Sequence, residues 1–136
     1  MTIDAGANPK KIALAIVFIW FVAGGIGHFA APDFFLRIIP PGWPLRIEAV
    51  YISGFFELAG AFGLLYVRTR RAAGIGLPIL TIAVTPANIY MWRNPGLFPQ
   101  IPEAMLALRL VLQVVLLAGI WWATWQADDD HRPAPY

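Results

Sequence analysis

Long apolar stretches dominate the chain. Windows of about 20 mostly apolar residues, the length that a membrane-spanning helix needs, lie near residues 12–31, 47–67, 72–92 and 104–125. None alternates strictly between polar and apolar residues, and none has the polar face that a helix of a soluble bundle would carry. The pattern predicts an all-α fold: a membrane-embedded up-down bundle of four helices over residues 12–126. Residues 1–11 would then be a cytoplasmic N-terminal segment, and residues 127–136 a polar cytoplasmic tail.

The first connecting segment, residues 32–46, is too apolar for a solvated loop. Four apolar residues recur at helical spacing within it: Phe34, Phe35, Ile38 and Ile39. Asp33 can cap a short helix there, and Pro40 and Pro41 would end it. We expect a short helix that lies in the membrane interface, either as an anchored connector or as a lid over a cavity.

Basic residues indicate the orientation of the bundle. Arg68, Arg70 and Arg71 form a tight basic loop between the second and third windows, and Lys10 and Lys11 precede the first. Because Lys and Arg favour the cytoplasmic side, we expect a protein integral to the cytoplasmic membrane with both termini in the cytoplasm.

Composition excludes several classes of protein. Of the 136 residues, 59% are hydrophobic and 13% are charged, against about 25% charged in an average soluble domain. This excludes intrinsic disorder, and the absence of cysteine excludes disulfide scaffolds and thiol redox chemistry. The sequence pI is about 9.3, but the basic residues are few and lie at the ends of the windows, so we expect no nucleic-acid partner.

Six polar residues interrupt the apolar windows at similar depth, and every window contributes at least one of them. They are His28, Ser53, Glu57, Asn88, Arg109 and Gln113. A charge in the middle of a bilayer costs roughly 2.5–3.5 kcal/mol on insertion scales, so each should find a partner inside the bundle. The simplest pairing joins Glu57 to Arg109, with Gln113, Asn88 and Ser53 satisfying the remaining donors and acceptors. His28 would either hydrogen-bond Glu57 or face the outer water.

Two interpretations of this polar set stay open. It is either a network that fixes the register of the helices, or the floor of a pocket that opens outward and binds a small amphiphile or relays protons. Glycines near His28 and Glu57 let helices approach closely and also leave space for a ligand. Pro86 removes the hydrogen bond to the carbonyl of Ile82, and Thr85 and Asn88 are near enough to replace it. The spacing around Glu57 and His28 does not support a zinc site. Haem ligation in a membrane usually takes two strong ligands, and His28 alone lies in a predicted span, because His131 lies in the tail.

Motifs along nearly the whole chain resemble the DoxX-like family of small four-span integral membrane proteins. They are Gly27-His28-Phe29 with Pro32, Phe34-Phe35 and Pro40-Pro41; Ser53-Gly54, Glu57-Leu58, Gly60 and Gly63-Leu64-Leu65; Arg68 and Arg70-Arg71; Pro86-Ala87-Asn88-Ile89-Tyr90; and Arg109 with Gln113. The resemblance implies a four-span bundle. Some members of that family are similar to subunits associated with quinone-linked sulfur oxidation, and others are linked to membrane oxidoreductase complexes or to receptor-assembly chaperones.

The residues and the resemblance together favour a non-catalytic accessory subunit or binding protein. It would hold a quinone-like or lipid-like molecule between the helices, with Glu57, Arg109 and His28 at the polar head. One alternative is a scaffold or assembly chaperone that binds another membrane protein through its glycine faces. Another is a small proton-coupled transporter, which would need a dimer to form a path. The expected partners are the bilayer, a second copy of the chain or a membrane oxidoreductase.

Overall fold

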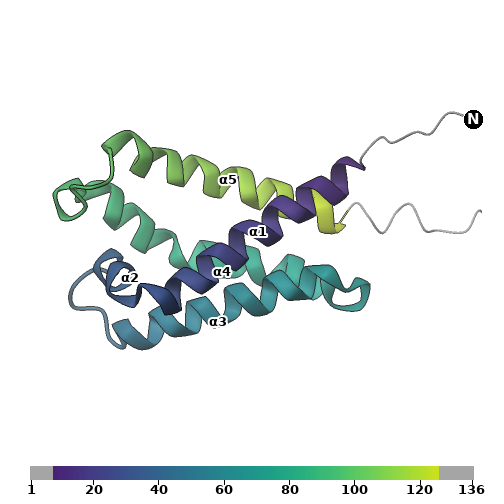
Figure 1. Cartoon of the computed structure of the whole chain (residues 1–136), viewed down its shortest axis with the longest axis horizontal. Helices are drawn as coiled ribbons and strands as arrows, with labels where there is room; N and C mark the ends of the chain where they lie inside the picture. Colours follow the sequence, from purple (N-terminus) through teal and green to yellow (C-terminus); the bar gives the residue numbers. More distant parts are fainter. Residues whose placement is uncertain (1–7, 126–136) are drawn as a thin grey trace, which may run out of the picture.

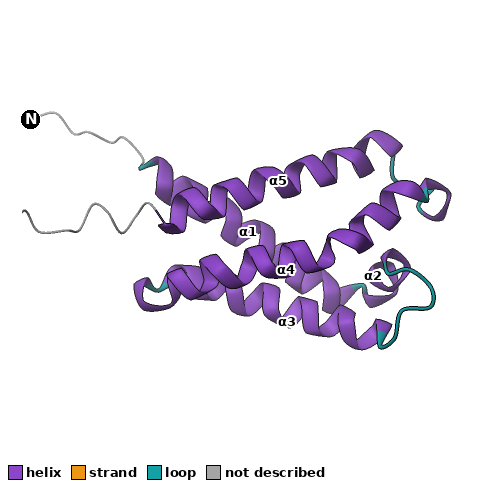
Figure 2. Cartoon of the chain, turned by 180° about the vertical axis from the view of Figure 1, so that it is seen from behind, coloured by secondary structure: helices purple, strands orange, loops and turns teal. Residues whose placement is uncertain are grey.

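The computed structural model describes residues 8–125 and is helical throughout, with no strand among these residues (Figures 1 and 2). The α-helices are α1 (Pro9–Ala30), α2 (Pro32–Ile38), α3 (Arg46–Leu65), α4 (Val67–Arg93) and α5 (Glu103–Trp125), and a 3₁₀ helix, η1 (Pro95–Leu97), precedes α5. The all-α bundle predicted from the sequence is confirmed. The predicted tail at 127–136 lies outside the described residues.

The four long helices form an up-down bundle. Each of α1, α3, α4 and α5 is long and apolar enough to cross a membrane. The helices pack in a ring in which α1 contacts α3, α3 contacts α4, α4 contacts α5, and α5 returns to α1. Figure 1 shows α2 and the α4–α5 connection at one end of the bundle, here called the α2 end, and the start of α1 and the end of α5 at the other.

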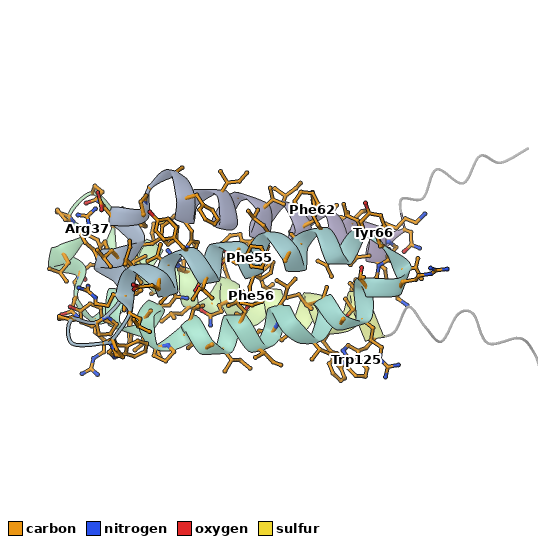
Figure 3. The ribbon with its side chains drawn as sticks, turned by 90° about the horizontal axis from the view of Figure 1, so that it is seen from below. Arg37, Phe55, Phe56, Phe62, Tyr66 and Trp125 are labelled. Carbon is orange, nitrogen blue, oxygen red and sulfur yellow. The ribbon has the colours of Figure 1, made fainter. Side chains whose placement is uncertain are left out.

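The outer surface of the bundle is apolar. Phe55, Phe56 and Phe62 of α3 are more than half exposed, and they project outward along the helix between Arg37 at one end and Tyr66 at the other (Figure 3). Exposed apolar side chains over the length of four spanning helices fit a lipid environment and not water. The chain is therefore a membrane protein.

The turn between α3 and α4 is tighter than the sequence suggested. Tyr66 alone separates the two helices, so the predicted basic loop is wrong, and Arg68, Arg70 and Arg71 lie in the first turns of α4. The hydroxyl of Thr69 donates to the carbonyl of Gly63 over 2.7 Å, and Nε of Arg70 donates to that of Leu64 over 2.9 Å. Both bonds satisfy carbonyls that the end of α3 leaves free, which lets the chain reverse in a single residue.

The short helix α2 confirms the helix expected after Pro32, but its cap differs from the prediction. Ala31 is the N-cap residue, and Asp33 lies in the first turn, where a carboxylate favours the positive end of the helix. The C-terminal end is held from α3, because one guanidinium nitrogen of Arg46 donates to the carbonyls of Leu36 and Ile39, each over 2.8 Å.

Apolar side chains fill the middle of the bundle at the α2 end. Phe98, which follows η1, is fully buried and packs with Ile38, Met91 and Leu106. Its ring meets that of Phe34 edge to face, with the centroids 5.9 Å apart. This packing joins α2 and the α4–α5 connection into one cover over the polar residues below it.

Candidate functional site

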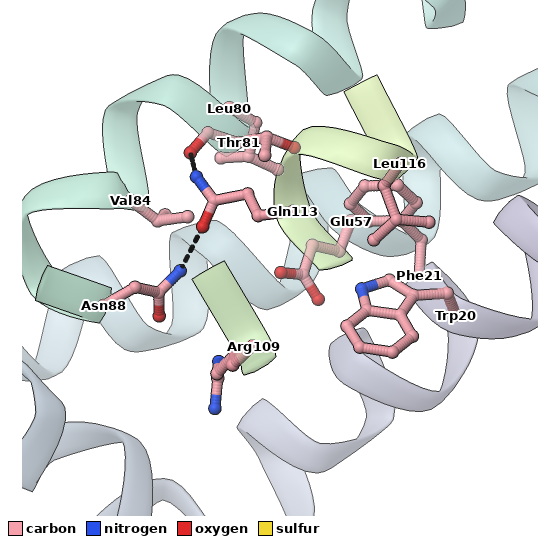
Figure 4. A pocket seen from close by; sticks show the side chains of 10 residues that line it. All are labelled: Trp20, Phe21, Glu57, Leu80, Thr81, Val84, Asn88, Arg109, Gln113 and Leu116. Carbon is pink, nitrogen blue, oxygen red and sulfur yellow. Dashed lines mark hydrogen bonds between the residues drawn. The ribbon is translucent and has the colours of Figure 1, made fainter. Parts of the chain in front are cut away.

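The six polar residues predicted from the sequence gather around two adjoining cavities within the bundle. Glu57, Asn88, Arg109 and Gln113 line an inner pocket, and the carboxylate of Glu57 points into its middle (Figure 4). His28 and Ser53 join Glu57, Asn88 and Arg109 around a second cavity beneath α2. The up-down topology therefore brings together polar groups from all four long helices, as the shared depth of these residues predicted.

Glu57 is paired with His28 and not with Arg109. Nε2 of His28 on α1 lies 3.6 Å from Oε1 of Glu57 on α3, and both side chains are largely buried. Within residues 8–125 no ion pair shorter than 4 Å joins Glu57 to Arg109, so the predicted pairing is wrong. The reason is geometric. His28 lies on α1, which packs directly on α3, whereas Arg109 lies on α5, which is not a neighbour of α3 in the ring of helices.

A close approach of two helices sets the His28–Glu57 distance. A β-carbon on Gly54 would lie 2.6 Å from Cβ of His28 and 3.2 Å from the carbonyl oxygen of Gly25. Only glycine therefore fits at this crossing of α1 and α3, one helical turn from Glu57. The close helix packing predicted from the glycines is therefore present between α1 and α3, and it places His28 beside the carboxylate of Glu57.

The site holds hydrogen-bonding groups that the protein leaves unused. Oε2 of Glu57 and Nδ1 of His28 are buried and have no hydrogen-bond partner among the described residues. The guanidinium of Arg109 has five N–H donors, and its one hydrogen bond within residues 8–125 runs over 3.8 Å to the sulfur of Met91. Buried polar groups without partners are costly, so free acceptors and donors at one cavity indicate a place for a polar ligand atom.

Gln113 and Asn88 differ from these three residues, because their side-chain amides hydrogen-bond to each other and, through Gln113, to other residues of α4. The Asn88 amide donates to Oε1 of Gln113 over 2.9 Å, and Nε2 of Gln113 donates to the carbonyl of Thr81 over 3.1 Å (Figure 4). Nε2 of Gln113 also donates to the hydroxyl of Thr85. The Thr85 hydroxyl donates in turn to the carbonyl of Thr81. These bonds tie α5 to α4.

The same bonds lie beside the proline interruption of α4. We expected Thr85 and Asn88 to bond the carbonyl of Ile82, which Pro86 leaves without its usual donor. Their hydrogen bonds instead go to the carbonyl of Thr81 and to Gln113. The polar set thus divides into two groups. Asn88 and Gln113 form a structural clamp between α4 and α5. Glu57, His28 and Arg109 keep hydrogen-bonding atoms without partners among the described residues.

The largest cavity that reaches Glu57 opens on the flank of the bundle. It has a volume of about 720 Å³ and lies between α1 and α5, with Glu57, His28 and Arg109 at its floor. Residues on its walls, among them Ile19 and Met105, are more than half exposed. We expected an opening toward the outer face, but this cavity faces sideways, where the hydrocarbon of a bilayer would lie.

Two aromatic residues outside the predicted polar set also line the site. Trp20 borders both the inner pocket and the flank cavity, and Phe35 of α2 stacks on His28 with the ring centroids 3.9 Å apart. One signal could have identified Trp20: tryptophan favours the interfaces of a membrane, and this one lies in the middle of a predicted span. The contact of Phe35 depends on the fold and has no such signal.

The described residues contain no group of three or more His, Asp or Glu side chains that could hold a metal ion. His131 lies outside them. The side chains around the cavity offer hydrogen bonding and charge, from the carboxylate of Glu57, the imidazole of His28 and the guanidinium of Arg109.

Comparison with known proteins gives a family but no function. Residues 15–126 match the sequence model of a family described as "Domain of unknown function (DUF8561)". No curated protein and no solved structure matches the chain.

Proposed function

Because the chain belongs to the DUF8561 family, whose description states no activity, we propose its function from the geometry of the site: it is a non-catalytic binding protein or accessory subunit for a quinone-like or lipid-like molecule. The molecule enters from the bilayer between α1 and α5. Its polar head meets Glu57, Arg109 and His28, and its apolar part stays in the flank cavity.

One observation carries this proposal. A cavity of about 720 Å³ has mostly apolar walls and is lined by Glu57, whose Oε2 is a buried acceptor with no hydrogen-bond partner among the described residues. Binding sites for small molecules are typically concave, mostly apolar and equipped with a few polar groups that fix the orientation of the ligand. A purely structural network would instead use its hydrogen bonds internally, as Gln113 does.

The proposal places the protein in the cytoplasmic membrane with both termini in the cytoplasm. Arg68, Arg70 and Arg71 at the turn between α3 and α4 lie at the same end of the bundle as the start of α1, so the basic residues of that end support one orientation. The resemblance to DoxX-like proteins is consistent with a role beside a membrane oxidoreductase, which would be the natural partner for a quinone-binding subunit.

Extraction and mass spectrometry test the proposal. The protein is purified in mild detergent, the bound small molecules are extracted, and the wild type is compared with Glu57→Gln. We expect a quinone-like or lipid-like molecule at near-stoichiometric amount with the wild type, and at least tenfold less with the variant. The matched control is Glu48→Gln, since Glu48 is exposed in the first turn of the same helix. Equal amounts in all three samples, or no molecule with the wild type, would overturn the proposal.

A second candidate function rests on a separate surface. Small exposed residues, including Ala59, Gly76 and Ala83, line a groove of about 620 Å³ between α3 and α4. Small residues let the helix of another membrane protein approach closely, which favours a scaffold or assembly role. Crosslinking from this groove in intact membranes tests it, and capture of a distinct membrane protein in defined stoichiometry is the supporting result. Capture of only a second copy of the chain would count against it.

A further inference from the structure

Glu57 and Arg109 lie where two cavities adjoin. The flank cavity between α1 and α5 and the cavity beneath α2 share four lining residues: His28, Phe35, Glu57 and Arg109. The two cavities differ in size, at about 720 Å³ and about 180 Å³. A molecule whose polar head meets Glu57 can therefore place an apolar tail along the flank and a small group beneath α2.

The volume beneath α2 limits what that group can be. An apolar cavity of about 150 Å³ is known to hold one benzene molecule. The cavity beneath α2, at about 180 Å³, has room for a single six-membered ring with a small substituent and not for a phospholipid head group. Its walls suit a ring, because Phe35, Ile38 and Trp43 are among the apolar side chains that form them.

Charge limits the group further. Glu57 and Arg109 bring an acidic and a basic side chain to the same cavity, so a neutral head that can hydrogen-bond to both is favoured over an anionic head, which only Arg109 could pair with. Oε2 of Glu57 lacks a donor, and Arg109 has donors to spare. A hydroxyl group can serve both residues, since it donates through its hydrogen and accepts through its lone pairs.

We propose that the ligand carries an uncharged, hydroxyl-bearing six-membered ring, which lies beneath α2 with the hydroxyl between Glu57 and Arg109, and a linear apolar tail that leaves along the flank cavity. This inference rests on the proposed binding function and narrows its ligand class to ring-headed amphiphiles.

Three probes with the same tail test the head group. The purified protein in detergent is incubated with equal concentrations of 4-decylphenol, 1-decanol and sodium decanoate, and the molecules retained are counted by native mass spectrometry. We expect at least tenfold more 4-decylphenol than either other probe. Equal or greater retention of decanol or decanoate would overturn this inference and leave the binding function standing. Retention of no probe would overturn both.

A pair of substitutions locates the ring. Ala49 lines the cavity beneath α2, whereas Ala59 is exposed on another face of the same helix. We expect Ala49→Leu to lower 4-decylphenol retention at least tenfold with decanol retention unchanged, and Ala59→Leu to alter neither. Ser53→Leu fills the same cavity from the next turn of α3 and serves if Ala49→Leu does not fold. Wild-type retention of the phenol in a folded cavity-filling variant would show that the ring lies elsewhere, against the inference.

Discussion

Gly24 on α1 makes room for the carboxylate of Glu57 on α3. A β-carbon built on Gly24 would lie 2.6 Å from Oε2 of Glu57, too close for any two such atoms. The atom it would meet is the far end of a flexible side chain, so the carboxylate can move while the helices stay in place. Gly24 therefore controls the position of Glu57 more than it controls the packing of α1.

We predict that Gly24→Ala removes binding without unfolding the protein. The methyl group displaces Oε2 of Glu57 from the floor of the flank cavity, so the retained ligand should fall at least tenfold. The midpoint of thermal unfolding should stay near that of the wild type, because alanine also favours a helix by about 0.5–1 kcal/mol over glycine. The control is Gly76→Ala, where a β-carbon meets nothing within 4 Å. Equal ligand retention in Gly24→Ala and Gly76→Ala would contradict the prediction.

The clamp between α4 and α5 gives a prediction on stability. Replacing Gln113 by alanine leaves the Asn88 amide without its acceptor, and replacing Asn88 leaves Oε1 of Gln113 without its donor. Each single variant should lower the free energy of unfolding in detergent, and the double variant should cost less than the sum of the two. Interhelical hydrogen bonds in membrane proteins contribute about 0.6 kcal/mol on average, with a maximum near 1.7, so we expect a coupling energy in that range.

A double-mutant cycle measures this coupling. Ser53 offers a control, because no hydrogen bond joins its side chain to Gln113 among the described residues, and the pair Ser53 and Gln113 should show additive effects. Additive effects for Asn88 and Gln113 as well would mean that the bond between them adds nothing to stability.

The sequence predicted the helices and the depth of the polar residues well, because both depend on local pattern. Apolar length defines a spanning helix, and an up-down order places Glu57 and Arg109 at one level. The pairing within that level was predicted wrongly, since attraction between opposite charges favoured Arg109 and the close crossing at Gly54 favoured His28.

Two other features depend on contacts between distant segments, and no local pattern encodes them. The complete burial of Phe98 requires Met91 and Leu106 to close around it. The sideways opening of the flank cavity depends on how α1 and α5 lie relative to each other, and no local pattern predicts the angle between two helices.

Arg46 should hold α2 in place over the cavity. Its guanidinium bonds two carbonyls at the end of α2, and hydrogen bonds to a charged group contribute about 1.5–3 kcal/mol each. We predict that Arg46→Met, which keeps the apolar stem, raises the rate of amide hydrogen exchange across residues 34–38 at least tenfold. Arg37→Met is the control, since Arg37 is exposed on α2 and lies over the ring of Phe34. Similar exchange rates in the two variants would show that Arg46 does not fasten the helix.

The orientation of the bundle can be tested without altering any native thiol, because the chain contains no cysteine. Val67, at the turn between α3 and α4, is 78% exposed, and Gln100, near the α2 end, is exposed as well. A single cysteine at either position should react with a maleimide once the reagent reaches it. The two positions therefore report on opposite ends of the bundle.

We predict that a membrane-impermeant maleimide labels Gln100→Cys in intact cells and labels Val67→Cys only after the membrane is permeabilised. The reason is the basic cluster beside Val67, because Lys and Arg favour the cytoplasmic side and this end of the bundle carries more of them, with Lys10 and Lys11 beside the three arginines, than the α2 end does. The reverse labelling pattern would invert the topology and place the α2 cover in the cytoplasm. Labelling of both positions in intact cells would mean that the arginines do not impose one orientation, although the flank cavity would still face the bilayer in either one.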